Sequence, residues 1–167
     1  IAPMESIGIT MATYCGQNRG AGKFSRIRAG IKQSTIISMI YCVVSFVIVS
    51  LLGGFITTLF VDAGETEIID LSVNYLRING LFYPTLGILF IFRNALQGMG
   101  YSLLPMTAGI SELAARSIVA FGFVTSLGFN AACLASPVAW IFADTLLLIV
   151  YFIKIKELKH ELLFKRR

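Results

Sequence analysis

The chain has 167 residues, of which 56% are hydrophobic and 14% are charged, and its formal net charge is +5. Soluble domains carry roughly 25% charged residues, so this composition, with a mean hydropathy of +0.80, excludes an ordinary soluble domain. The positive charge does not indicate nucleic-acid binding, because the basic residues form two clusters beside apolar runs without an interleaved aromatic surface. We expect an all-α integral membrane protein, a polytopic helical bundle.

Five membrane segments are predicted in chain order. The first, about residues 1–15, would make only about 22 Å of helix, so we expect a truncated helix and a chain that is a fragment, or an incompletely predicted product, of a longer protein. Each later segment contains a long uncharged run, and about 20 apolar residues suffice to cross the hydrocarbon layer. Four full helices are therefore expected at about residues 25–61, 71–97, 104–128 and 136–155, followed by a tail at 156–167.

The connecting segments alternate in charge. A predicted tight turn, in which Gly20 and Gly22 would allow positive φ, lies in a stretch with five basic residues and no acid: Arg19, Lys23, Arg26, Arg28 and Lys32. Residues 62–70 hold four acids and no base, and a turn at 129–136 is expected before the fifth segment. The positive-inside rule places both basic clusters in the cytoplasm and the acidic loop outside. We expect a multi-pass protein of the plasma or inner membrane with a cytoplasmic C-terminus.

The third segment carries a polar stripe. Steps of three and four residues place its polar side chains on one helical face, and Pro84 and Gly87 interrupt the same helix. Interrupted membrane helices are frequent where transporters bind cargo, but a proline kink with interhelical hydrogen bonds explains the pattern equally well. The residues of the stripe are Asn79, Tyr83, Arg93 and Gln97.

The fourth segment contains Glu112 and Arg116, which are four residues apart and can pair within one helix. That pair could lower the cost of membrane insertion and do nothing more. Alternatively, one partner is shared with Arg93 or with a helix outside this chain and titrates during turnover. Glu5 and Asp144 are lone acids in the first and fifth segments and are possible secondary members of the pathway, since buried charges in a membrane require partners.

The sequence does not predict an enzyme. It lacks HExxH, GxSxG, a Cys/His pair and a carboxylate dyad at helical spacing. GQNRGAGK has five residues between Gly16 and Gly22 and Phe24 after its lysine, which does not fit a phosphate-binding loop. The three cysteines show neither paired nor metal-type spacing. We expect no catalytic residue, no metal site and no cofactor.

Three blocks of the sequence resemble one family in order and in spacing. GQNRGAGKFSRIRAG, FRNALQGMGYSLLP and GISELAAR resemble the loop after the eighth helix, the turn between the tenth and eleventh, and an E-L-x-x-R element of the eleventh in the MATE family, the multidrug and toxic compound extrusion transporters. The resemblance covers essentially all of residues 1–167 and implies a partial C-terminal transmembrane lobe.

The resemblance also implies an activity and partners. Members of the family have twelve helices in two lobes and export organic, often cationic, compounds in exchange for inward flow of Na⁺ or H⁺. The implied partners are a small amphiphilic or cationic substrate, the lipid bilayer and an N-terminal lobe of the same protein. The chain departs from one branch, which places an acidic cation ligand in the tenth helix, where Leu86 stands here. A lipid-linked precursor flippase of the same broad superfamily, or a structural membrane protein that transports nothing, remains an alternative.

Overall fold

The computed structural model describes residues 1–62 and 64–164, with side chains described through residue 158. Within these residues the chain forms helices joined by short turns and contains no strand. The helices are α1 (Ala2–Gly20), α2 (Phe24–Thr58), α3 (Thr66–Leu81), α4 (Tyr83–Gly98), α5 (Leu103–Leu127) and α6 (Phe129–Phe164). The all-α prediction is confirmed.

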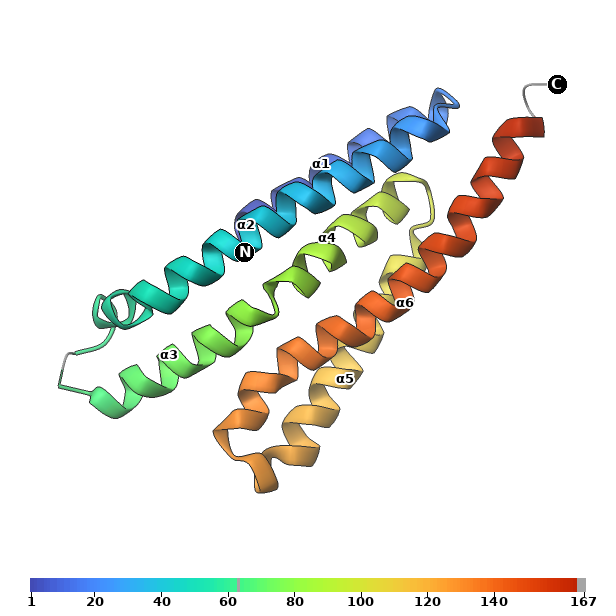
Figure 1. The fold of residues 1–167 in the computed structure, drawn as a ribbon. Helices are drawn as coiled ribbons and strands as arrows, with labels where there is room; N and C mark the ends of the chain where they lie inside the picture. The colour runs from blue at the N-terminus through green and yellow to red at the C-terminus, as the bar shows by residue number, and fades with distance from the viewer. Residues whose placement is uncertain (63, 165–167) are drawn as a thin grey trace.

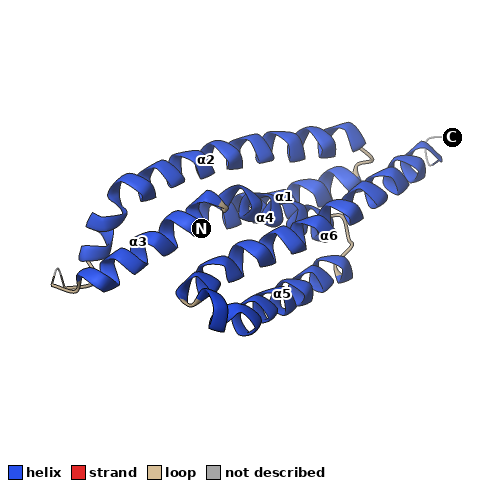
Figure 2. Ribbon diagram, turned by 60° about the horizontal axis from the view of Figure 1, so that its bottom comes forward, coloured by secondary structure: helices blue, strands red, loops and turns tan. Residues whose placement is uncertain are grey.

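The helices form an elongated bundle with α3 and α4 end to end through its middle (Figure 1). On one side of this central pair lie α1 and α2, and on the other α5 packs along α6, as a second view also shows (Figure 2). Because α4 contacts every other helix in the described chain, its residues form the centre of the core. Leu89, Ile91 and Leu96 of α4 are almost completely buried.

The length and composition of the helices fit a membrane. Among the described residues, α2, α5 and α6 are long and apolar enough to span one, and α3 with α4 forms a fourth candidate span that is bent by 51°. These four correspond to the four full helices predicted from the sequence, and α1 is not among the candidates. Large apolar side chains such as Leu51, Phe60 and Phe121 are 77%, 84% and 83% exposed, as expected of side chains that face lipid.

The predicted helix at 71–97 is two helices. Helix α3 ends at Leu81 and α4 begins at Tyr83, with Phe82 between them. Pro84 has no N–H to donate to the carbonyl of Gly80, four residues earlier, and its ring crowds that carbonyl, so the helix bends. Gly80 and Gly87 let α2 approach the bend, because an added Cβ would meet Phe46 at Gly80 and Ser38 at Gly87.

The predicted turn at 129–136 is wrong, because these residues belong to α6. The actual turn is Gly128, whose φ of 53° favours glycine. Alanines recur every four residues in the first half of α6 and are buried, so packing stabilises helix where composition suggested a turn. They are Ala131, Ala135, Ala139 and Ala143.

The first predicted boundary is also wrong, because α1 continues beyond residue 15 to Gly20. Only residues 21–23 connect it to α2, and Gly22, not Gly20, has positive φ, at 66°. The end of the predicted tail, 165–167, lies outside the described residues, and its described beginning is the last part of α6.

Small residues bring α1 and α4 into close contact. Gly8, Ala12 and Gly16 recur every four residues along α1, a spacing that lets membrane helices approach closely. An added Cβ on Gly98 would collide with the backbone of Ala12, and one on Gly16 would lie 2.9 Å from the carbonyl oxygen of Gly98. This contact fixes the end of α4 beside α1.

Both basic segments lie at one end of the bundle. The guanidinium of Arg19 on α1 lies 4.8 Å from the centre of the Tyr101 ring, and the Lys154 ammonium on α6 lies 5.4 Å from it. Tyr101 belongs to the α4–α5 turn, so one aromatic ring links three parts of the chain. The acidic α2–α3 loop is at the far end of the bundle (Figure 1).

Candidate functional site

Two arginines hold one carboxylate between α4 and α5. Arg93 of α4 donates from Nη2 to Oε2 of Glu112 at 2.7 Å, and Arg116 of α5 donates from Nη2 to Oε1 of the same carboxylate at 2.9 Å. Each carboxylate oxygen therefore has its own cationic donor. The structure contains both pairings that the sequence left open: Glu112 pairs with Arg116 within α5 and also with Arg93 of α4.

The two ion pairs differ in exposure. The side chains of Arg93 and Glu112 are 26% and 17% exposed, whereas that of Arg116 is 44% exposed. The described helices leave part of Arg116 uncovered, whereas the Arg93–Glu112 pair lies largely inside the bundle. Charge-assisted hydrogen bonds of this length are stronger than neutral ones, and their strength rises as water is excluded.

A second carboxylate lies within electrostatic range of this pair. Asp144 of α6 is 6% exposed, and its charge interacts with those of Arg93 and Glu112. Its Oδ1 atom is buried without a hydrogen-bond partner in the described structure, and so is Nε of Arg93. A buried acceptor and a buried donor thus both retain unused hydrogen-bonding capacity. We call Arg93, Glu112, Arg116 and Asp144 the charge cluster; it contains two bases and two acids from three helices.

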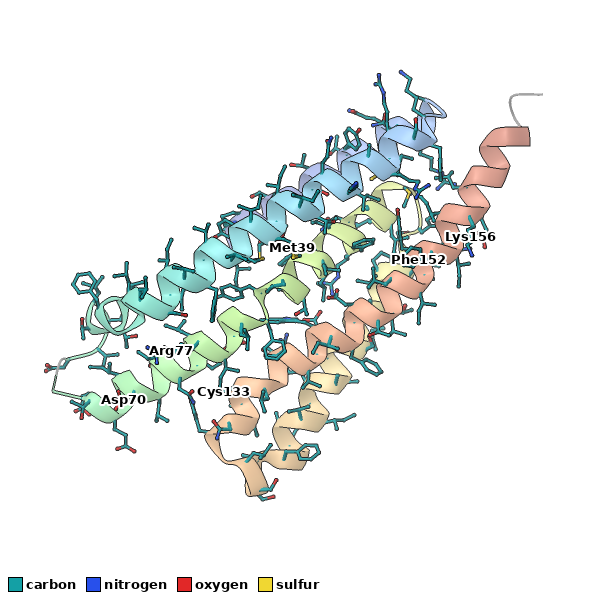
Figure 3. All side chains as sticks on the ribbon, in the orientation of Figure 1. Met39, Asp70, Arg77, Cys133, Phe152 and Lys156 are labelled. Atoms are coloured by element: carbon teal, nitrogen blue, oxygen red, sulfur yellow. The ribbon has the colours of Figure 1, made fainter. Side chains whose placement is uncertain are left out.

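The bend at Phe82 divides the polar stripe predicted on the third segment, so that Asn79 belongs to α3 and Tyr83, Arg93 and Gln97 belong to α4. Asn79 is buried in α3 and donates to the carbonyl oxygens of Tyr75 at 3.0 Å and Cys133 at 3.4 Å. It is an interhelical hydrogen-bond donor, which matches the packing interpretation of this residue. Figure 3 shows Cys133 on α6 beside α3.

The remaining predicted residues form no hydrogen bond or ion pair with the charge cluster in the described structure. Tyr83 is half-buried at the start of α4, where its carbonyl oxygen accepts a hydrogen bond from the Cys42 thiol at 3.3 Å. Gln97 is exposed near the end of α4. Glu5 is exposed on α1 and pairs with no described residue. Of the predicted set, the structure brings together Arg93, Glu112, Arg116 and Asp144.

The place of Asp144 in the core had a signal in the sequence. Trp140, Asp144, Leu147 and Tyr151 follow one another by steps of four, three and four, and all four are buried. Asp144 is therefore a charged residue within an otherwise apolar core stripe. The spacing indicates burial, but only the packing of α6 on α4 identifies Arg93 as its neighbour.

The chemistry open to the cluster is binding of a cation or a proton. Glu112 already accepts from two arginines, whereas Asp144 has an unpartnered oxygen in a water-poor site. A displaced or protonated carboxylate would leave Arg93 free to redistribute its hydrogen bonds. No group of three or more His, Cys, Asp or Glu side chains suited to a resident metal ion occurs among the described residues.

Comparison with known proteins identifies the family. Residues 1–122 match the MatE family. The chain belongs to this family. It is also 30% identical, over 168 residues, to a protein from Thermotoga maritima called probable multidrug resistance protein NorM. The alignment covers 99% of this chain but 36% of the relative, so the MatE chain spans about a third of that relative's length. No solved structure matches the chain.

Proposed function

We propose that this chain is the C-terminal transmembrane lobe of an exporter that removes drugs or organic cations in exchange for Na⁺ or H⁺. The observation that carries the proposal is membership of the MatE family together with a charge cluster inside a bundle of membrane-spanning helices. The relative's printed name, a probable multidrug resistance protein, supports the same activity. The cytoplasm would face the end that carries Arg19 and Lys154.

The charge cluster would line or support the transport pathway. A charge at the centre of a membrane helix costs about 3 kcal/mol on insertion scales, and this chain places four such groups on three adjoining helices. Asp144 is the best candidate for the residue that binds the coupling ion, because Glu112 is already bound by two arginines. In addition, Leu86 stands at the position where one branch of the family has its acidic cation ligand. Binding of a proton or Na⁺ at Asp144 would weaken its attraction for Arg93 and strengthen the hold of Arg93 on Glu112.

Export by the complete transporter tests this role. Glu112→Gln removes the charge but keeps the shape, so both arginines lose their ionic partner, and we expect export to fall by at least tenfold while the protein remains folded. The control is Asp70→Asn, which removes an equivalent charge from an exposed position on α3 (Figure 3). Normal drug resistance in the Glu112→Gln variant would reject the role.

Two alternatives have distinct outcomes. A flippase for lipid-linked precursors would fail to export drugs but would translocate a bulky amphipathic cargo in vesicles. In a purely structural protein, replacing all four residues of the charge cluster together by apolar residues of similar size would preserve or increase stability, since apolar groups often replace a complete buried ion-pair network without loss. A transporter carrying the same four substitutions would stay folded and lose export.

A further inference from the structure

A groove with one basic wall lies between α2 and α6, at the end of the bundle that carries the basic segments. Its volume is about 610 Å³. These two helices have few contacts with each other, and α4 forms the floor between them. The groove residues that carry the argument are Phe24, Ser25, Arg28, Lys32, Phe92 and Tyr151.

The basic side chains of the groove are available to a ligand. Arg28 and Lys32 are four residues apart on α2, so they lie on the same face of the helix. Both are exposed, and neither forms an ion pair within the described part of the chain. Tyr151 lies on the opposite wall of the same groove. Two cations and a phenol therefore converge on one opening.

The floor of the groove is apolar and well packed. Phe92 of α4 and Tyr151 of α6 are 9% and 7% exposed, and their rings meet edge to face with centres 4.9 Å apart. Aromatic pairs in this geometry are energetically favourable. Farther along α2 the lining continues with Ile36, which is 50% exposed. The groove thus changes from charged to apolar along its length.

The level of the groove matches the boundary between headgroups and acyl chains. Lys32 is the last charged residue before the uncharged run 34–61, and Tyr151 precedes Lys154 by three residues. Lysine, arginine and tyrosine concentrate at this boundary, and basic pockets between membrane helices on the cytoplasmic side bind anionic headgroups. A soluble anion would use the basic wall but not the apolar continuation.

We propose that this groove binds one anionic glycerophospholipid from the leaflet that faces the basic end. Arg28 and Lys32 hold the phosphate, Ser25 and Tyr151 offer hydroxyl donors to the headgroup, and an acyl chain lies along Ile36 toward Phe92. The groove shares no lining residue with the charge cluster, and lipid binding there would not require the transported substrate.

The test is lipid binding to the complete transporter in detergent, measured by native mass spectrometry with phosphatidylglycerol and phosphatidylcholine. Each basic residue near an anionic surface strengthens binding about fivefold, so Arg28→Gln with Lys32→Gln should weaken phosphatidylglycerol binding by about 25-fold. The matched control is Lys23→Gln with Arg26→Gln, which removes the same charge from exposed residues outside the groove lining. The control should retain most of the binding.

Several results would overturn the assignment. The wild-type protein could bind both lipids equally, the two double variants could lose equal affinity, or inorganic phosphate at millimolar concentration could displace the lipid. Unfolding temperatures measured in phosphatidylcholine should agree among wild type and both variants, because all four arginines and lysines are exposed. If the groove variant alone unfolds early, the charge-conserving pair Arg28→Lys with Lys32→Arg replaces it and should keep the phosphatidylglycerol preference; loss of that preference would contradict the proposal.

Discussion

Replacing Arg93 by methionine should destabilise the protein far more than the same change at Arg116. Both arginines donate to Glu112 at nearly equal distances, 2.7 and 2.9 Å, so distance alone predicts equal effects. Breaking a fully buried pair costs about 3–5 kcal/mol, whereas an exposed pair contributes about 0.2–1 kcal/mol. The Arg93–Glu112 side chains are 26% and 17% exposed, which places this pair between the two limits, at about 2–3 kcal/mol.

The charge balance of the cluster increases the difference. Arg93 is the base that interacts with both Glu112 and Asp144, so its removal leaves two carboxylates with one arginine, Arg116, which is bonded to Glu112. Arg116 is 44% exposed, and after its loss Glu112 keeps its bond to Arg93, so its loss should cost less than the loss of Arg93.

The assay is chemical or thermal unfolding of the purified transporter in detergent, with Arg77→Met as control, because exposed Arg77 makes only one long side-chain hydrogen bond, at 3.3 Å, to a carbonyl oxygen. Equal losses for Arg93→Met and Arg116→Met would refute the reasoning from burial. A further loss of stability on adding Asp144→Asn to Arg93→Met would refute the proposed charge balance, since Asp144 is the acid that loses the attraction of Arg93, and removing its charge should restore stability.

Two other predictions concern packing. Gly98→Ala should lower the stability measured by thermal unfolding by about 1–3 kcal/mol, because the new Cβ would meet the backbone of Ala12, which cannot move like a side chain. The control Gly54→Ala, where nothing lies within 4 Å of the added Cβ, should be neutral or slightly stabilising. Equal losses of stability in the two variants would contradict the close contact between α1 and α4. The folded protein should react slowly with maleimides at Cys15, Cys42 and Cys133, which are 0% exposed, and rapidly after denaturation; fast labelling of the native protein, detected by mass, would show that these thiols are not buried.

Much of the fold could be predicted because long uncharged runs in a sequence indicate membrane helices. The four spans and the pairing of Glu112 with Arg116 follow from local sequence alone. Pro84 signalled the bend at Phe82, although the sequence could not show whether the helix would kink or end. The start of α6 was misplaced because its alanines favour helix only when another helix packs against them, and packing is not visible in composition.

The charge cluster was predictable only in part, because contacts between helices are not visible in the sequence. Spacing joins residues within one helix, and it placed Glu112 beside Arg116. Contacts between helices depend on crossing positions, which are set here by glycines such as Gly98 and by the α6 alanines. The link from Arg93 to Glu112 was therefore one of several open possibilities, and the proximity of Asp144 to Arg93 required the three-dimensional arrangement.

The central claim is that the chain crosses the bilayer four times after α1 with both basic segments on the cytoplasmic side. Single cysteines placed at Ala21, Gly64 and Lys156, all exposed, in a background in which the three native cysteines are alanine, can be labelled in intact cells with a membrane-impermeant maleimide. The account predicts that the cysteine at position 64 is labelled at once, whereas those at 21 and 156 are labelled only after the membrane is opened. Labelling of positions 21 and 156 from opposite sides would contradict it.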